Sequence, residues 1–352
     1  MNFIDYIKTN GNSTFEEVPF NEVDNAILCQ ITYVSFEKVI NLNKRYTLEE
    51  LSKRYFSKYS DEDIKKDKSL IAKSPLVLRE AGKTKRFKDV VMHHYKLSFS
   101  ENSVRQFAAM QFDLNDGTTY VSFRGTDDSI LGWKEDFQMA YKKIEGFEQA
   151  KRYINLYCSF FRKYRVGGHS KGGALALYAS LNSFSLKRRN IIEVYSNDGP
   201  GIKKEYIGND IDKLSCKYIK IVPQDDIIGT IFDDDKDHYI VKSNALGFFQ
   251  HDMFSWQVNN LSFIRCDSLD KGSIKLRKTI NDYIEKVPRR EVEKVSDSLF
   301  MFFKDANITK VSELIDFKDL NIFSLFKSRN NIDENTIKIL FHIVTILVKS
   351  RF

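Results

Sequence analysis

The sequence predicts an α/β fold with a mostly parallel central sheet, and two observations lead to this prediction. Between residues 91 and 267, short β-type runs alternate with patterns of helical period, and such alternation is typical of βαβ units. A glycine-rich turn, VGGHSKGGALALYAS at 166–180, also joins a strand-like run directly to a helix former. We therefore expect a helical segment at 1–90 packed on an α/β core at 91–267. A charged helical extension at 268–352 would form a cap or lid.

The first elements follow from local patterns. Residues 21–36 carry apolar side chains at helical spacing, and TLEE at 47–50 resembles a capping box that opens a helix. Three β-type runs come next, VVMHHYKLSFS, VRQFAAMQFDL and TTYVSFRGT. Asn-Asp-Gly at 115–117 separates the last two runs and predicts a hairpin.

Strands and helices then alternate along the chain. Residues 147–164 predict a helix, and the glycine-rich turn follows it. Further strands are expected at 191–197, 218–223 and 238–243. This order predicts a doubly wound sheet, with helices from the crossovers on both faces.

The last segment, TIKILFHIVTILVKSRF at 336–352, has its polar residues on one narrow helical stripe. It is too short and too interrupted to span a bilayer. We expect a C-terminal helix docked on the core, and a lid, a membrane contact or a dimer helix are the alternatives.

Composition excludes several classes of protein. Of the 352 residues, 42% are hydrophobic and 29% charged, which is ordinary for a globular protein and not for a disordered one. The 55 basic residues nearly balance the 48 acidic ones, so no nucleic-acid partner is expected. The N-terminus lacks the pattern of a secretory signal, and the cysteines have no CxxC spacing. We expect reduced thiols in a cytoplasmic protein, with no metal and no cofactor; the cysteines are Cys29, Cys158, Cys216 and Cys266.

The glycine-rich turn contains the pattern G-x-S-x-G, GHSKG at 168–172. In this pattern a serine at the tip of a strained strand-to-helix turn projects from the sheet, and the glycines two positions away leave room for the close packing of the turn. Ser170 is therefore the candidate nucleophile. The alternative is a plain glycine-rich βα turn that binds phosphate.

A nucleophilic serine needs a base and an acid. In enzymes that carry their serine on this kind of turn, the acid follows the serine in the sequence and the histidine follows the acid. Three histidines follow Ser170. His238 comes after a run of aspartates and His342 lies on the polar stripe of the last segment, so solvated positions are expected for both. His251 lies in a loop after the last strand, where the base is expected.

Three aspartates are candidates for the acid. Asp225 and Asp226 follow the predicted strand at 218–223, at the edge where a catalytic carboxylate is expected. Asp198 follows the preceding strand in SNDGPG, although Asp-Gly there first indicates a turn.

Several of these motifs resemble those of class 3 (fungal-type) lipases. GHSKGG resembles their GHSLGG, VSFRGTDDSILGWKEDF resembles their FRGT…W…D segment, and QDDIIG resembles their acid-bearing D-I-V-P segment. HDMFSW falls where their histidine does. The nearest resemblance is to uncharacterised bacterial lipase-like α/β-hydrolases related to these lipases. It covers about residues 90–265, and PFNEVDNAILCQITYVSF near the N-terminus is similar to the same group.

The resemblance implies an α/β-hydrolase fold and a triad of Ser170 as nucleophile, Asp226 as acid and His251 as base. Asp226 is preferred to Asp225 because it directly precedes the Ile-Ile pair that matches the family's Ile-Val. The sequence departs from the family pattern in that Gly229 replaces the proline of that segment.

The resemblance also implies two oxyanion donors, Thr126 and the backbone N–H of Lys171. Arg124, Trp133 and Asp136 would brace the loop that carries Thr126. Lys171 replaces the family's leucine, which is expected to put a positive charge beside the acyl site. This charge and the basic balance of the chain lead to the hypothesis that anionic or phospholipid-like esters are substrates.

The function expected from these residues is a serine ester hydrolase that acts through an acyl-enzyme on Ser170, on a small-molecule or lipid ester. One alternative is a catalytically silent binding or scaffold protein on the hydrolase fold. Another is a membrane-peripheral protein that uses its helical termini. The sequence leaves the acyl chain, the head group and the oligomeric state open.

Overall fold

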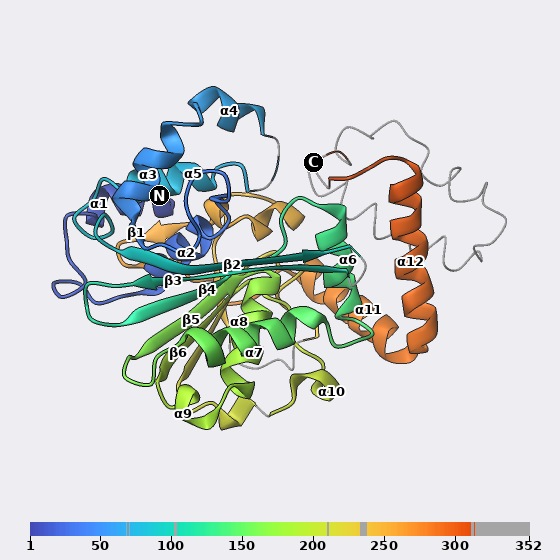
Figure 1. Ribbon diagram of the computed structural model, residues 1–352. Helices are drawn as coiled ribbons and strands as arrows, with labels where there is room; N and C mark the ends of the chain where they lie inside the picture. The colour runs from blue at the N-terminus through green and yellow to red at the C-terminus, as the bar shows by residue number, and fades with distance from the viewer. Residues whose placement is uncertain are drawn as a thin grey trace.

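A mixed sheet forms the centre of the structure (Figure 1). The computed structural model describes residues 1–67, 69, 71–101, 104–209, 211–232, 238–310 and 313. These residues form an eight-stranded sheet whose strands lie side by side in chain order, from β1 to β8. The pairs from β1 to β4 are antiparallel, and those from β4 to β8 are parallel. The predicted α/β fold class is therefore confirmed.

The strands are β1 (Tyr46–Thr47), β2 (Val91–Ser100), β3 (Arg105–Asp113), β4 (Thr119–Phe123), β5 (Tyr164–His169), β6 (Ile191–Asn197), β7 (Lys217–Pro223) and β8 (Tyr239–Val241). A separate hairpin pairs β9 (Val258–Asn259) with β10 (Ser262–Phe263). The helices of the N-terminal segment are α1 (Phe3–Asn10), α2 (Glu22–Ile31), α3 (Leu48–Phe56), α4 (Asp61–Lys66) and α5 (Ser74–Ala81). The later helices are α6 (Ile130–Gln138), α7 (Glu145–Tyr157), α8 (Lys171–Asn182), α9 (Ser185–Arg188), α10 (Lys204–Ile207), α11 (Lys271–Lys286) and α12 (Arg289–Asp305), with short 3₁₀ turns at η1 (Ile211–Lys213), η2 (Gly247–His251) and η3 (Met253–Ser255).

The two faces of the sheet are covered by different parts of the chain. Along β3, Ala108 and Met110 pack in one core with the N-terminal helices, whereas Phe107 and Ala109 pack in a second core with α7 and α8. Because the parallel strands follow in chain order and crossovers are right-handed, the crossover helices lie on a single face. A doubly wound sheet was expected, with crossover helices on both faces. Instead, the crossover helices cover one face and α1–α5 cover the other (Figure 1).

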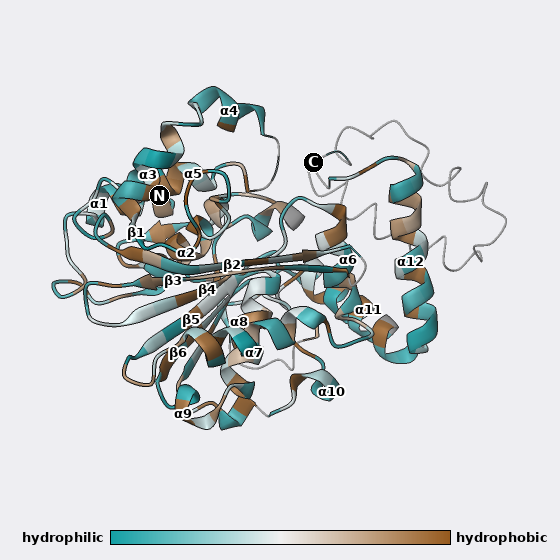
Figure 2. Ribbon diagram, viewed as in Figure 1, coloured by the Kyte–Doolittle hydropathy of each residue, from teal (hydrophilic) through white to brown (hydrophobic). Residues whose placement is uncertain are grey.

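Local signals place the N-terminal helices. The predicted capping box is present: the Thr47 side chain accepts from the Glu50 N–H, and Glu50 bonds back to the Thr47 N–H. Asn21 caps α2 in the same manner, and α2 ends at Ile31, short of the expected 36. Figure 2 shows α4 as mostly hydrophilic, in keeping with Ile64 as its buried residue.

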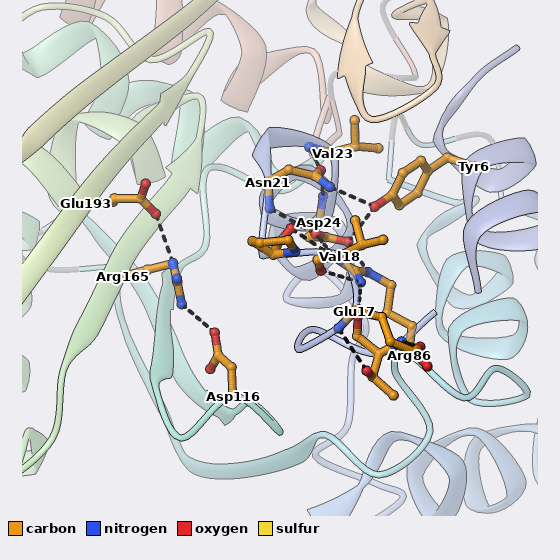
Figure 3. Close-up of polar contacts among 12 residues, drawn as sticks. Tyr6, Glu17, Val18, Asn21, Val23, Asp24, Arg86, Asp116, Arg165 and Glu193 are labelled. Atoms are coloured by element: carbon orange, nitrogen blue, oxygen red, sulfur yellow. Dashed lines mark hydrogen bonds and ion pairs between the residues drawn. The ribbon is translucent and has the colours of Figure 1, made fainter. Parts of the chain in front are cut away.

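A buried ion pair joins the ends of the N-terminal segment (Figure 3). The Arg86 guanidinium donates to both Asp24 carboxylate oxygens, at 2.8 and 2.5 Å, and both side chains are fully buried. Tyr6 also donates to Asp24, and the guanidinium lies 4.1 Å from the centre of the Phe15 ring. Such bidentate pairs fix geometry as well as add energy. The pair therefore ties α1 and α2 to the chain that enters β2.

The helix expected at 147–164 ends earlier. The structure forms α7 over Glu145–Tyr157, and Cys158 is already in an extended conformation. Residues 158–163 form a loop in which Ser159 Oγ accepts from the Phe161 N–H at 3.1 Å. This loop turns the chain from the end of α7 into the start of β5.

The C-terminal helices lie at one end of the sheet (Figure 1). α12 contacts α6, with the Phe137 and Phe300 rings 5.5 Å apart and Lys134 paired with Asp297 at 2.9 Å. The helix expected at 336–352 lies outside the described residues. Among the residues the structure does describe, no helix has the length and apolar character needed to cross a membrane.

Candidate active site

Ser170 lies at the tip of a strained turn between β5 and α8. Its backbone angles are φ 57° and ψ −134°, a region that residues with a side chain rarely adopt. A side chain at Gly168 would lie 2.2 Å from the Gly172 carbonyl carbon, and one at Gly172 would lie 2.2 Å from the Phe123 oxygen. As predicted, the close packing of the turn leaves no room for a side chain at Gly168 or Gly172. Ser170 N donates to Asn197 O at 2.9 Å, which helps to hold the turn.

His251 ends the η2 turn, and a hydrogen bond connects it to His169, the residue before Ser170. His169 Nε2 lies 2.8 Å from the His251 carbonyl oxygen, and the two rings lie 4.5 Å apart. Because a carbonyl only accepts, His169 donates through Nε2, and its Nδ1 then accepts from the Tyr33 hydroxyl at 3.0 Å. Burial lowers the pKa of His169 well below its usual value, so that the ring is neutral.

The acid that contacts His251 is Asp198. His251 Nδ1 lies 2.6 Å from Asp198 Oδ2, and Asp198 is 1% exposed. Because the carboxylate accepts from Nδ1–H, the imidazole presents Nε2 as its basic nitrogen. Burial lowers the pKa of His251 to about 4, so that the ring is neutral at neutral pH.

Sheet register explains how Asp198 reaches this position. His169 on β5 pairs with Asn197 on β6, so the residues that follow, Ser170 and Asp198, leave the same edge of the sheet side by side. Asp198 has φ 48°, which places it in the left-handed region that aspartate tolerates better than most residues. The family resemblance implied Asp226 as the acid, and Asp198 was a further candidate at which Asp-Gly first indicated a turn. Its position at a strand end was the signal for a site residue.

Asp226 lies behind Asp198 rather than against the histidine. Its two oxygens accept from the backbone N–H groups of Gly229 and Thr230 at 2.7 and 2.8 Å, and its carboxyl hydrogen-bonds to Asp198. In this geometry Asp198, and not Asp226, makes the hydrogen bond to His251. β7 ends one strand further from Ser170 than β6 does, so the nearer strand supplies the partner of His251.

Two buried carboxyls in contact cannot both remain ionised easily. Burial raises the pKa of Asp226 well above its usual value, and the neighbouring Asp198 raises it further. Burial also raises the pKa of Asp198, to about 6, while the hydrogen bond from Asp226 opposes that rise. Asp226 is therefore the protonated member of the pair, and it donates to Asp198.

Asp225, the other candidate acid, holds the histidine loop. Its Oδ2 accepts from Gly247 N at 2.6 Å, at the start of η2, and its backbone N–H donates to Gln250 at 2.9 Å. Ser273 at the start of α11 donates to the other carboxylate oxygen at 2.7 Å. Asp225 thus links β7, the turn that ends at His251 and the first C-terminal helix.

The loop that carries Thr126 passes directly over the serine turn. A side chain at Gly125 would lie 3.1 Å from Ser170 Cβ and 2.4 Å from the His169 oxygen. The Thr126 hydroxyl bonds to both Asp136 carboxylate oxygens, at 2.8 and 2.6 Å. Asp136 therefore braces this loop as expected. Lys171 is the first residue of α8, where backbone N–H groups have no acceptor within the helix.

The Lys171 side chain points into an ion cluster and is fully buried. Its ammonium lies 2.6 Å from Glu135 and 3.5 Å from Asp136, and Glu135 is fully buried as well. The expected positive charge beside the acyl site is thus neutralised by two carboxylates. The part of the hypothesis for anionic esters that rests on Lys171 therefore loses its basis, whereas the part that rests on the basic balance of the chain is untouched.

The other candidates lie elsewhere. His238 precedes β8, at the edge of the sheet where parallel strands start, which is opposite to Ser170. His342 lies outside the described residues. Within the described ranges, no group of three or more metal-binding side chains occurs.

Comparison with known families adds to this geometry. The model of the family described as Mbeg1-like matches residues 81–301, more than half of the chain. No curated protein matches the chain. At the family level this match suggests a lipase-like hydrolase. The matched range contains the strained Ser170 turn and the Asp198–His251 pair, and the chain belongs to the Mbeg1-like family.

Proposed function

We propose that this protein is a serine hydrolase of carboxylic esters, with Ser170 as nucleophile, His251 as base and Asp198 as acid. The Asp198–His251 contact of 2.6 Å, at the sheet edge where Ser170 leaves β5, carries the proposal. A strained serine at the same sheet edge as a neutral histidine that an acid orients is the arrangement expected to activate a hydroxyl.

The reaction begins when Ser170 Oγ attacks the ester carbonyl carbon. His251 Nε2 takes the hydroxyl proton as the carbon–oxygen bond forms, and Asp198 stabilises the imidazolium. When the tetrahedral intermediate collapses, the bond to the leaving alcohol breaks and His251 gives that alcohol the proton. The serine is left acylated. Water, deprotonated by His251, then attacks the acyl-enzyme, and collapse releases the acid and restores Ser170.

The oxyanion of each intermediate is placed beside the start of α8. The Lys171 N–H and the loop at Thr126 supply the donors, and the positive end of the helix dipole adds to them. Asp136 positions that loop through the Thr126 hydroxyl. Each such donor contributes about 3–4 kcal/mol in other serine hydrolases.

Asp226 has a supporting role in this proposal. As a neutral acid it donates to Asp198, and Gly229 N also donates to Asp198 Oδ1 at 3.2 Å. Both bonds stabilise the carboxylate form of Asp198, which is otherwise costly to bury. Asp198 can then remain charged when His251 takes a proton.

The substrate class follows in part from charge. Since Lys171 is neutralised by Glu135 and Asp136, the cluster gives no reason to favour anionic esters over neutral ones. A kinship with class 3 lipases and a cytoplasmic location remain part of the proposal.

Fluorophosphonate labelling with peptide mass mapping tests the proposal. We expect one adduct, on Ser170, that is absent in Ser170→Ala and at least about 10³-fold slower in His251→Ala. Ser180→Ala, a change in the same helix away from the turn, is the matched control and should label normally. A folded protein without an adduct between pH 6 and 9 would favour the silent scaffold instead.

A further inference from the structure

The edge of the sheet opposite Ser170 carries a group of exposed apolar side chains. They lie at the end of α7, in the loop that follows it and around α9, and their exposed fractions are high: Leu156 72%, Phe160 52%, Phe161 96%, Phe184 65% and Leu186 58%. We call these five residues, with the basic residues Arg152, Lys163, Arg188 and Arg189, the Phe161 surface. Of the eleven large hydrophobic side chains exposed among the described residues, five belong to it.

Direct contacts join the two segments into one surface. Asn190 Nδ2 donates to the Phe160 oxygen at 2.7 Å, and the Phe184 N–H donates to Asn155 Oδ1 at 2.9 Å. The Lys187 ammonium lies 3.6 Å from the centre of the Phe160 ring. Figure 1 shows α9 at the end of the molecule where β5 and β6 start.

The same part of the chain is strongly basic. Residues 149–192 contain no aspartate or glutamate, although the whole chain has 48. They contain nine basic residues: Lys151, Arg152, Arg162, Lys163, Arg165, Lys171, Lys187, Arg188 and Arg189. Carboxylates from other segments neutralise several of them, including Arg162, Arg165 and Lys171.

Four of the basic residues keep their charge available. In the part of the chain that the structure describes, no ion pair is formed by Arg152, Lys163, Arg188 or Arg189. Arg152, Lys163 and Arg189 are exposed. Lys163 lies against Arg189, since its ammonium donates to the Arg189 oxygen at 3.4 Å, and Phe161, two residues before Lys163, is 96% exposed.

This combination fits a lipid surface better than a protein partner. Protein interfaces bury flat apolar centres that are depleted of lysine. Here exposed apolar side chains occur in the same two segments as exposed basic residues, which matches a bilayer whose acyl region takes aromatic and aliphatic side chains and whose phosphates attract lysine and arginine.

We propose that the Phe161 surface docks this protein peripherally on an anionic lipid bilayer. Phe161, Phe184 and Leu186 enter the boundary between head groups and acyl chains, and the four basic residues contact lipid phosphates. The proposal does not depend on ester hydrolysis. It places the membrane contact on the α/β core rather than on the terminal helices. Because β5 is six residues long, about 20 Å separate Ser170 from the end of the sheet that contacts the bilayer.

Vesicle co-sedimentation of the full chain tests this docking. The probes are vesicles of phosphatidylcholine alone and of phosphatidylcholine with 30% phosphatidylglycerol, each at about 50 and 500 mM salt. We expect binding to the anionic vesicles at low salt, with a loss of at least about tenfold at high salt or on neutral vesicles. Equal binding to both kinds of vesicle would overturn the electrostatic part of the proposal.

Paired variants locate the contact. Phe161→Ser with Leu186→Ser, and separately Lys163→Glu with Arg189→Glu, should each weaken binding to the anionic vesicles at least about tenfold. Phe99→Ser is the control for an exposed apolar residue on β2. Lys275→Glu with Lys278→Glu on α11 makes the same change in net charge, and both controls should bind within about twofold of the wild type.

Two outcomes would reassign the surface. If binding survives the Phe161 and Leu186 changes but is lost when residues 336–352 are deleted, the last segment is the anchor and the proposal fails. If no variant or wild type binds vesicles, and sedimentation velocity shows self-association that Phe161→Ser abolishes, the surface joins two copies of the chain instead. Thermal melting and fluorophosphonate labelling, measured on every variant, verify that the fold and the serine turn are intact.

Discussion

Asp198 Oδ2 lies 2.6 Å from His251 Nδ1, and the Asp226 carboxyl lies on the other side of Asp198. Three titratable groups thus form a line that starts at the histidine and ends at the backbone N–H groups of Gly229 and Thr230. The order of the line gives the two aspartates different roles. The nearer one orients the histidine, and the farther one holds a proton.

Asparagine substitutions separate these roles. We expect Asp198→Asn to lower kcat for a p-nitrophenyl ester by about 10⁴-fold, because an amide no longer fixes the productive histidine tautomer. Asp226→Asn should keep activity within about tenfold, since an amide N–H can replace the carboxyl O–H as donor to Asp198. A larger loss in Asp226→Asn than in Asp198→Asn would instead support Asp226 as the acid that acts on His251.

The pH dependence of labelling reports the histidine. Because burial lowers the pKa of His251 to about 4, the ring stays neutral and basic down to mildly acidic pH. Because the pKa of Asp198 is raised to about 6, we expect the rate of fluorophosphonate labelling to fall first between pH 7 and 5, as Asp198 takes a proton, and again near pH 4, as the ring takes one. Circular dichroism at each pH separates this loss from unfolding. In Asp198→Asn the first fall should be absent, and a remaining midpoint near the ordinary histidine value, about 6.5, would contradict the burial argument.

Stability should depend on pH through Asp226. Its pKa is raised on folding, so above the ordinary value of 3.8 the folded state binds more protons than the unfolded chain does. The free energy of unfolding contributed by this group therefore falls as pH rises from about 4 towards 7. We expect Asp226→Asn to reduce that fall and to raise the free energy of unfolding at pH 7 by about 1–2 kcal/mol. Urea denaturation of both proteins at pH 4.5 and 7 measures the difference.

The sequence predicted the elements of the site better than their pairing. The constraints on Ser170 are local, since its glycines and the following helix lie within ten residues, and the turn forms as expected. The choice between Asp198 and Asp226 depends on which strand lies next to β5, and this is set by pairing across the sheet. Register between strands distant in sequence leaves little trace in local patterns.

Two other differences have the same origin. Lys171 was expected beside the substrate because its neighbour is Ser170, but its side chain extends to Glu135, 36 residues away on α6. The sheet was expected to be doubly wound because strands and helices alternate, and the alternation does not reveal which face each helix covers. The N-terminal helices, predicted from caps and apolar spacing, fill the face that the crossovers leave.

The Lys171–Glu135 pair predicts a non-additive effect on stability. Both side chains are fully buried, and Glu135 also accepts from the Gln106 N–H at 3.0 Å. Lys171→Leu, which introduces the residue of the lipase motif, would leave the carboxylate buried without its ammonium partner. We expect it to lower the free energy of unfolding by about 3–5 kcal/mol.

Adding Glu135→Gln should restore at least about 2 kcal/mol, because the amide oxygen still accepts from Gln106 and the fully buried carboxylate is gone, while the partly exposed Asp136 keeps its bond to Thr126. Urea denaturation of the wild type, both single variants and the double variant gives the coupling energy. Lys151→Leu, on a partly exposed pair with Glu148, is the matched control and should cost less than about 1 kcal/mol. Strict additivity of the two buried changes would mean that the ammonium of Lys171 is neutralised by Asp136 and not by Glu135.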